Sequence, residues 1–430
     1  MNKNKINWVA VLTMMFLFGM ISFVTNLAAP IGNVWKAQPA IGGSNFWGMM
    51  GNMMNFLAYL FMGLPAGKLI LKYGYKKTTL IGVAVGFFGV FIQFLSGKIG
   101  VGASIAGLPA NFFVYLLGAF ISGFSVCILN TVVNPMLNLL GGGGNKGNQL
   151  VQVGGTFNSL TGTLTPMLVN SLIAKITAET QIADVNPVLF IAMGVFAATF
   201  AVLVFVPFVE PEQERTDASV KSLFKYKHLV YGVIAIFLYV GVEVGIPGTL
   251  NFYLTDTLGT ENAVATAGFV AATYWFLMLC GRFLSSLISG KVSSKMQLTV
   301  TCSVAIALVV GAIFASPETL TSMPVFTGSS FVMAKVPLSA LLLVCCGLCT
   351  SVMWGAIFNL SVEGLGKNSA LASGLFMTMV VGGGILPLVQ NALIDSSNPA
   401  SYMTSYWVVV AALAYMLWFA VRGSKVKTTK

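Results

Sequence analysis

The polar stretch EPEQERTDASVKSLFKYKH, residues 210–228, divides a chain that is otherwise almost entirely apolar. A helix that crosses a bilayer needs about 20 consecutive apolar residues. Six such runs precede the stretch and six follow it, at 7–34, 46–69, 78–97, 110–138, 150–175, 186–208, 229–254, 264–289, 296–315, 336–360, 368–394 and 402–421. We therefore predict an all-α membrane protein with twelve transmembrane helices in two six-helix bundles, residues 1–209 and 229–430, joined by a central cytoplasmic loop, 210–228.

The composition excludes an ordinary soluble domain. Of the 430 residues, 57% are hydrophobic and 8% are charged, whereas soluble domains carry about 25% charged residues. The net charge of +11 raises the alternative of nucleic-acid binding, but the positions of the cations argue against it. With the N-terminus inside, all lysines and arginines lie on cytoplasmic segments or helix ends except Lys36, Lys98, Lys175 and Lys335. This positive-inside pattern predicts a multi-pass protein of a bacterial inner membrane with both termini in the cytoplasm.

Residues for catalysis or metal binding are scarce. The one histidine, His228, lies at the start of the seventh predicted helix, so neither a Ser-His-Asp triad nor a histidine metal site can be assembled. The six cysteines lie inside apolar runs, which is typical of small core residues. We expect no enzymatic activity, no metal site and no cofactor.

Glu243 is the one acid that the predicted spans place near mid-membrane, where a charge costs about 2.5–3.5 kcal/mol on insertion scales. At 1.5 Å per residue it lies roughly 21 Å from the cytoplasmic end of its helix, and Arg282 about 10 Å from that side, so we expect no direct pairing. Two interpretations stay open. Glu243 either serves substrate binding and proton or cation coupling, or is a neutral structural carboxyl that hydrogen-bonds to adjacent helices.

Amide side chains are frequent within the predicted spans. An amide offers both donors and an acceptor, which suits a neutral polyhydroxyl ligand better than an ion. The alternative is hydrogen bonding between helices, worth about 0.6 kcal/mol on average in membranes. The amides that we expect to bind substrate are Asn26, Asn55, Asn130, Asn158, Asn251 and Gln390.

Tyr274, Trp275 and Trp354 lie away from the predicted membrane interfaces, where tryptophan usually concentrates. Their placement favours a platform on which the apolar face of a sugar packs, with core packing as the alternative. The fourth and tenth predicted helices share a glycine spacing, and superposing Gly123 on Gly347 places Asn130 opposite Trp354. We therefore predict that Asn130 and Trp354 line one cavity, where stacking and hydrogen bonding combine.

Several stretches of the chain resemble one transporter family. The loop GKLILKYGYKK, residues 67–77, keeps the glycines and cations of the major facilitator loop signature, with Leu71 in place of its aspartate. The chain is also similar, over nearly its whole length, to the fucose/galactose/glucose symporter family of the major facilitator superfamily in NTVVNPMLNLLG (130–141), TFNSLTG (156–162), YVGVEVGIPGTLNFYL (239–254), YWFLMLCGRF (274–283), SVMWGAIFNLSVEGLG (351–366) and SGLFMTMVVGGGILPLVQNALID (373–395). The resemblance implies the major facilitator fold and symport of a monosaccharide with a proton.

The chain departs from this family at the positions of the proton-handling carboxylates. Ala29 stands where the family typically has an aspartate, Asn130 where it has a glutamate, and Gly155 where it often has a glutamine. Glu243 is left as the candidate for coupling, and the resemblance leaves open whether a proton, a sodium ion or no ion is carried. We expect uniport or an atypical coupling.

The leading interpretation is a transporter that moves a small neutral sugar across a lipid bilayer by alternating access. A carrier for an amino sugar, a nucleoside or a drug is the first alternative. A nontransporting sugar receptor is the second, and the short central loop and tails favour a carrier over it.

Overall fold

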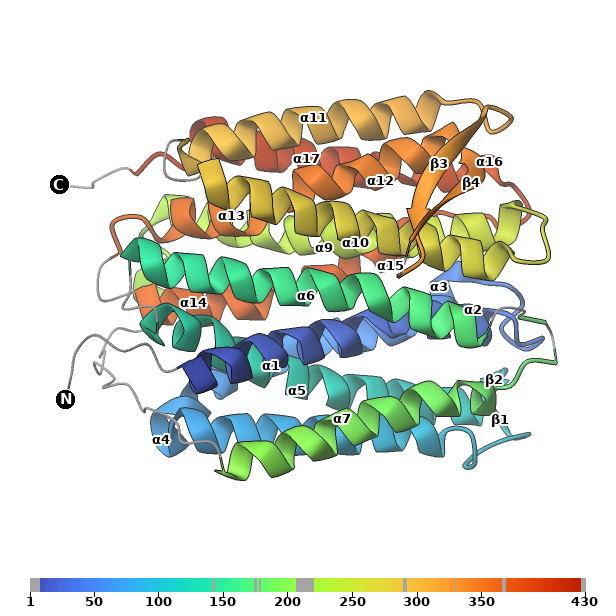
Figure 1. The fold of residues 1–430 in the computed structure, drawn as a ribbon, viewed down its shortest axis with the longest axis horizontal. Coiled ribbons are helices and arrows are strands. Elements are labelled where there is room, and N and C mark those ends of the chain that lie inside the picture. Colours follow the sequence, from blue (N-terminus) through green and yellow to red (C-terminus); the bar gives the residue numbers. More distant parts are fainter. Residues whose placement is uncertain are drawn as a thin grey trace.

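The structure is a computed structural model that describes residues 8–140, 144–173, 176–177, 179–205, 220–288, 292–328, 330–365 and 369–426. Its long helices lie side by side along the longest axis of the molecule (Figure 1). An apolar segment in lipid is expected to form a helix, because a helix satisfies its backbone N–H and C=O groups internally. Residues 210–219 of the predicted central loop lie outside the described residues.

The chain up to residue 205 forms a first group of helices, which we call the N-terminal half. Its elements are α1 (Trp8–Asn26), α2 (Ala28–Lys36), α3 (Asn45–Gly48), α4 (Met50–Leu95), α5 (Ala110–Leu140), α6 (Gly144–Leu172), a 3-10 turn (Ile182–Val185) and α7 (Asn186–Phe205). The chain from residue 220 forms the second group, which we call the C-terminal half. Its helices are α8 (Val220–Leu223), α9 (Lys227–Thr257), α10 (Ala263–Ile288), α11 (Ser294–Phe314), α12 (Leu338–Thr350), α13 (Met353–Val362), α14 (Ser369–Met379), α15 (Gly382–Ala392), α16 (Ala400–Ser405) and α17 (Trp407–Trp418), followed by a π-helical turn (Phe419–Gly423).

Several predicted spans are interrupted or joined. The first span is divided at Leu27 between α1 and α2, and the tenth and eleventh are each divided into two helices. The second and third spans are joined in α4, where Gly74 has φ of 79° and ψ of 173°. That positive φ is inexpensive for glycine alone, so Gly74 places the turn inside the loop 67–77.

Eleven helices among the described residues are long and apolar enough to cross a membrane. The predicted span 150–175 corresponds to α6, which is not among the eleven because Gly, Asn, Gln and Thr interrupt its apolar residues. It is nevertheless 29 residues long and runs alongside α1 and α10 (Figure 1). The one predicted span outside this set is therefore the most polar of the long helices that face the functional site described below.

Two short antiparallel hairpins occur in the loops of this helical bundle. Strand β1 (Ser104–Ile105) pairs with β2 (Leu108–Pro109), and β3 (Leu320–Phe326) pairs with β4 (Phe331–Pro337). Rings hold the longer hairpin against α10, because Phe276 stacks on Phe326 with centroids 5.0 Å apart. This hairpin segment contains valine, threonine and phenylalanine, which favour strands. Helix α10 provides the surface on which it packs.

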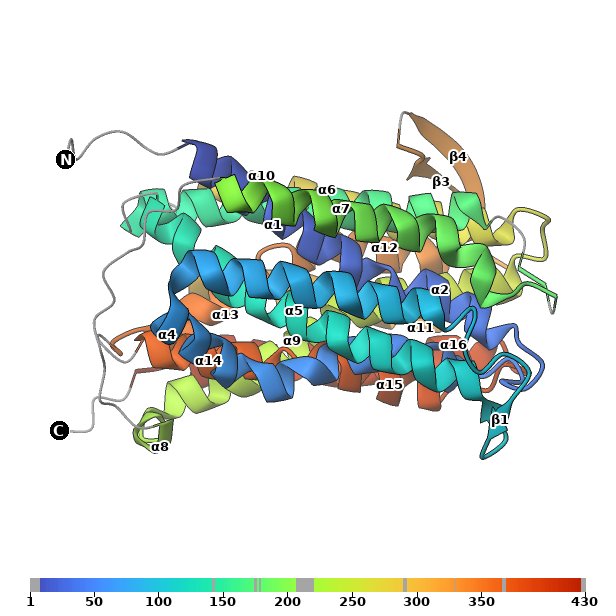
Figure 2. The same ribbon diagram turned by 90° about the horizontal axis from the view of Figure 1, so that it is seen from below.

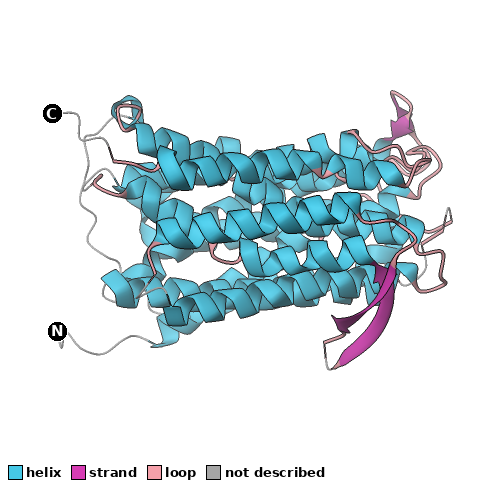
Figure 3. Ribbon diagram, turned by 90° about the horizontal axis from the view of Figure 1, so that it is seen from above, coloured by secondary structure: helices cyan, strands magenta, loops and turns pink. Residues whose placement is uncertain are grey.

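The two ends of the bundle differ. Helix α1 begins, and the chain leaves the last helix, at the end opposite the strands (Figures 1 and 2). The strands and most of the long described loops lie at the other end (Figure 3). The short helices α2, α3 and α16 are also at the strand end (Figure 1). We call this the hairpin end.

Candidate functional site

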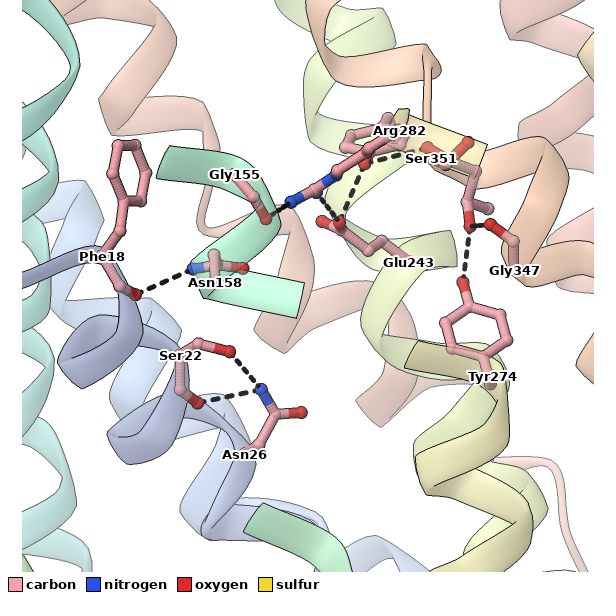
Figure 4. Close-up of polar contacts among 12 residues, drawn as sticks. Phe18, Ser22, Asn26, Gly155, Asn158, Glu243, Tyr274, Arg282, Gly347 and Ser351 are labelled. Carbon is pink, nitrogen blue, oxygen red and sulfur yellow. Dashed lines mark hydrogen bonds and ion pairs between the residues drawn. The ribbon is translucent and has the colours of Figure 1, made fainter. Parts of the chain in front are cut away.

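One face of α6 carries Gly155, Asn158 and Gly162, which the helical repeat places in one row. Asn158 Nδ2 donates a hydrogen bond to the carbonyl of Phe18 on α1 at 3.2 Å (Figure 4). A Cβ atom on Gly162 would lie 3.1 Å from Trp275 Cδ2 on α10. We call this row the α6 face. It contacts α1 of the same half and α10 of the other half, and its two glycines lie where α6 comes closest to α10.

Glu243 on α9 forms an ion pair with Arg282 on α10. Its Oε1 atom accepts a hydrogen bond from the Tyr239 hydroxyl at 2.8 Å and lies 3.3 Å from Arg282 Nη2. Arg282 Nη1 donates to the Gly155 carbonyl on α6 at 2.6 Å. The side chains of Arg282 and Glu243 are 11% and 13% exposed, so both charges are largely removed from solvent. Arg282 thus connects an acid of the C-terminal half to the backbone of the N-terminal half (Figure 4).

The prediction that Glu243 and Arg282 do not pair is wrong. It compared depths counted from two helix ends, which is valid only if both helices end at the same level. It also ignored the length of the arginine side chain, which carries the charge far from its own backbone. Glu243 therefore has a countercharge where the sequence analysis gave it none.

Two further predicted residues surround the α6 face. Asn26 Nδ2 donates to the Ser22 carbonyl at 2.9 Å, and a Cβ atom on Gly162 would lie 3.1 Å from Ser22 Oγ. Asn26 thus bonds one helical turn back on α1, to the serine that faces Gly162 of α6. Trp275 is 5% exposed and lies seven residues before Arg282, on the same side of α10. The tertiary structure brings Asn158, Trp275 and Glu243 to one interface between the halves, whereas Asn26 bonds within α1.

Asn130 and Trp354 have separate surroundings. The ring of Trp354 on α13 meets the ring of Tyr239 edge-on, with centroids 6.1 Å apart, which joins it to the Glu243 group. Asn130 Nδ2 donates instead to the Tyr59 hydroxyl on α4 at 2.6 Å, a contact within the N-terminal half. The cavity shared by Asn130 and Trp354 stays a prediction.

The described part of the chain contains no group of three or more His, Cys, Asp or Glu side chains that would hold a metal ion. The chemistry around the α6 face is that of the Glu243–Arg282 ion pair, the Asn158 amide and the Trp275 indole. Such a set recognises a polar ligand by hydrogen bonds and by packing.

Residues 9–388 match the protein family described as the Major Facilitator Superfamily. The chain belongs to this superfamily. It is therefore a multi-pass membrane transporter with the major facilitator fold. The family resemblance found in the sequence is confirmed, and so is the fold class.

Relatives of this major facilitator chain match it along most of its length. It is 27% identical over 421 residues to the glucose/galactose transporter of Brucella abortus, covering 95% of this chain and 92% of the relative. It is 28% identical over 426 residues to the putative glucose/galactose transporter of Helicobacter pylori, covering 95% of each. The crystal structure of the Escherichia coli fucose:proton symporter superposes with a TM-score of 0.69 at 17% identity, covering 98% of this chain and all of that one.

Two other predicted residues of the major facilitator chain lie apart from the α6 face. Asn251 Oδ1, near the hairpin end of α9, accepts a hydrogen bond from Asn33 Nδ2 of α2 at 2.6 Å. Gln390 Nε2 on α15 donates to Ser405 Oγ at 3.3 Å and is 1% exposed. Asn251 therefore touches the opposite half, whereas Gln390 bonds within its own.

Tyr274 and Asn55 are both buried in the major facilitator bundle. The Tyr274 hydroxyl lies 2.9 Å from Thr350 Oγ1, and the side chain is fully buried between α10 and α12. Asn55 is 4% exposed, and its Oδ1 atom has no hydrogen-bond partner among the described residues. A substrate role for either residue stays a prediction.

Sequence reasoning missed three residues, of which Arg282 and Asn33 lie at contacts between the halves and Tyr239 lies beside Glu243. Depths counted from helix ends wrongly exclude Arg282 as a partner of Glu243. Tyr239 precedes Glu243 by one helical turn, and this spacing signals a possible contact. Asn33 lies one residue from the end of the first predicted span, 7–34. A polar side chain at a span end can face water, so the sequence carries no clear signal for its contact with Asn251.

Proposed function

We propose that this transporter carries a monosaccharide across a bacterial inner membrane by alternating access, with both termini in the cytoplasm. Residues 1–209 and 229–430 act as two bundles that move around a site at their interface. The observation that carries the proposal is the position of Arg282, which bonds to Glu243 in its own half and to the Gly155 carbonyl in the other. A ligand that takes over one of these bonds changes how strongly the halves are joined.

The chemistry of the interface supports a neutral ligand rich in hydroxyl groups. Glu243 and Arg282 balance each other's charge, so an ion of either sign gains little there. Carboxylate, guanidinium and the Asn158 amide together offer acceptors and donors for hydroxyl groups. The indole of Trp275 adds a flat apolar surface of the kind that packs on a sugar ring. The names of the relatives, glucose/galactose transporter, favour hexoses as the class to test first.

We propose uniport rather than proton symport. Ala29 and Asn130 cannot titrate in the physiological range. Glu243 is engaged, because its Oε1 atom already accepts hydrogen bonds from Tyr239 and Arg282. An ion drives accumulation only if its affinity differs between the two facing states, and these contacts hold Glu243 within helix packing.

Uptake into proteoliposomes tests the substrate class. Purified protein is expected to take up at least one of labelled glucose, galactose and fucose in a saturable manner, with competition by the same unlabelled sugar. Trp275→Ala should strongly reduce this uptake, because it removes the proposed stacking surface. The matched control is Trp407→Ala, which removes an indole that is 46% exposed on α17. Folded protein that transports uridine or glucosamine but none of the hexoses would contradict the proposal.

A further inference from the structure

Helices α2 and α9, one from each half, are joined at the hairpin end by two polar contacts. Asn33 Nδ2 donates to Asn251 Oδ1 at 2.6 Å. One turn further along α2, Lys36 Nζ lies 2.8 Å from both carboxylate oxygens of Asp256. Lys36 is 7% exposed and Asp256 25%, so this ion pair is set into the interface. Both contacts cross from the N-terminal to the C-terminal half.

Phe252 fills a notch between these two contacts. Its ring is fully buried, and a Cβ atom on either Gly32 or Gly48 would lie 3.3 Å from Phe252 Cζ. The amine of Lys36 lies 4.7 Å from the ring centroid, a cation–π distance. A side chain larger than hydrogen at either glycine would press on the ring. The N-terminal half therefore presents a notch shaped for an aromatic ring of the C-terminal half.

The ion pair belongs to a closed ring of hydrogen bonds. Lys36 Nζ donates to Asn45 Oδ1 at 2.9 Å, and Asn45 Nδ2 donates to the Tyr402 hydroxyl at 2.7 Å. The Tyr402 hydroxyl in turn donates to Asp256 Oδ2, which completes the ring. Two members come from each half, so separation of the halves breaks the ring at two places.

The amide contact is incompletely satisfied. Asn33 Oδ1 and Asn251 Nδ2 are buried and have no hydrogen-bond partner among the described residues. Turning both amides over leaves the same count, one acceptor and one donor without a partner. Buried polar groups without partners are costly, and water satisfies them when the halves separate. The unpartnered atoms Asn33 Oδ1 and Asn251 Nδ2 therefore destabilise the closed arrangement, whereas the ion pair and Phe252 stabilise it. Opposing contributions of this kind suit a contact that must both open and close.

We propose that Phe252, seated in the Gly32–Gly48 notch and flanked by the Lys36–Asp256 and Asn33–Asn251 contacts, is the gate that closes the outer entrance of the transporter. We call this set the outer gate. The inference rests on alternating access and on the proposed cytoplasmic position of the termini, which places the hairpin end outside. It does not depend on which solute is carried.

Labelling from outside tests the outer gate without any substrate. Met49→Cys provides the reporter, because Met49 is 1% exposed and its Cε atom would lie 3.3 Å from a Cβ atom on Gly248 of α9. Right-side-out vesicles are treated with a membrane-impermeant maleimide, and the chain without the reporter corrects for the native cysteines. Lys36→Ala is expected to speed labelling about tenfold, a shift of ~1.4 kcal/mol toward the open state. Phe252→Ala should act in the same direction.

Two comparisons keep the test decisive. Lys98→Ala is the matched control, since Lys98 also lies 4.9 Å from a phenylalanine ring, that of Phe94, but within one half. It should leave labelling unchanged. The double variant Lys36→Asp with Asp256→Lys should label more slowly than either single variant, because it restores opposite charges. Equal labelling of all variants, faster labelling in Lys98→Ala, or no rescue in the double variant would overturn the gate. Labelling of the reporter cysteine in inside-out vesicles but not in right-side-out vesicles would also overturn the outer gate.

Discussion

At the scale of single residues, Glu243 and Arg282 each depend on the other. Removing one member of a largely buried ion pair leaves an uncompensated charge, which typically costs about 3–5 kcal/mol. Arg282→Ala should therefore lower the thermal unfolding temperature of the purified protein markedly. The double variant Glu243→Gln with Arg282→Gln leaves no charge and should recover most of that loss.

The double-mutant comparison also separates stability from transport. If the pair serves only packing, the double variant should transport as well as the original chain once its folded fraction is matched. We expect it to transport poorly, because the double variant lacks the arginine that bonds both to residue 243 and to the Gly155 carbonyl of the other half. An Arg282→Ala protein that unfolds at the original temperature would contradict the importance of the pair.

At the scale of elements, the α6 face depends on the absence of side chains at its glycines. A Cβ atom on Gly162 would already lie 3.1 Å from both Ser22 Oγ and Trp275 Cδ2, so a branched side chain has no room there. Gly162→Leu should separate α6 from α1 and α10 and abolish uptake. Gly194→Leu is the control, since no atom lies within 4 Å of a Cβ at this glycine on α7. Normal uptake by Gly162→Leu would show that the close approach is not needed.

At the scale of the whole molecule, the coupling of transport depends on what the carboxylates contact. Glu243 contacts Arg282 and Tyr239, both of which belong to its own half. We expect sugar uptake into proteoliposomes to stop at the external concentration. An imposed pH or sodium gradient should not raise this plateau, because Glu243 keeps these two partners when the halves move apart. Accumulation that collapses with an uncoupler would refute uniport and would identify Glu243 as the first residue to test as the proton carrier.

The sequence by itself determined the membrane class, the positions of most spans and the superfamily. The reason is physical, since a bilayer of fixed thickness imposes one length and one composition on every spanning helix. The resemblance in six stretches added the fold, which the superfamily match confirms. Breaks such as the one at Leu27 remained hidden because they occur inside runs that are apolar on both sides.

Only the tertiary structure decided which polar residues meet. Glu243 and Arg282 lie 39 residues apart in the chain, and Asn33 and Asn251 lie 218 apart, so no local pattern reports either contact. The composition of a span shows that a polar side chain must find a partner, but the partner is fixed by helix tilt, relative height and side-chain length. These quantities depend on how the helices pack against one another, and packing is a property of the assembled bundle rather than of any single stretch.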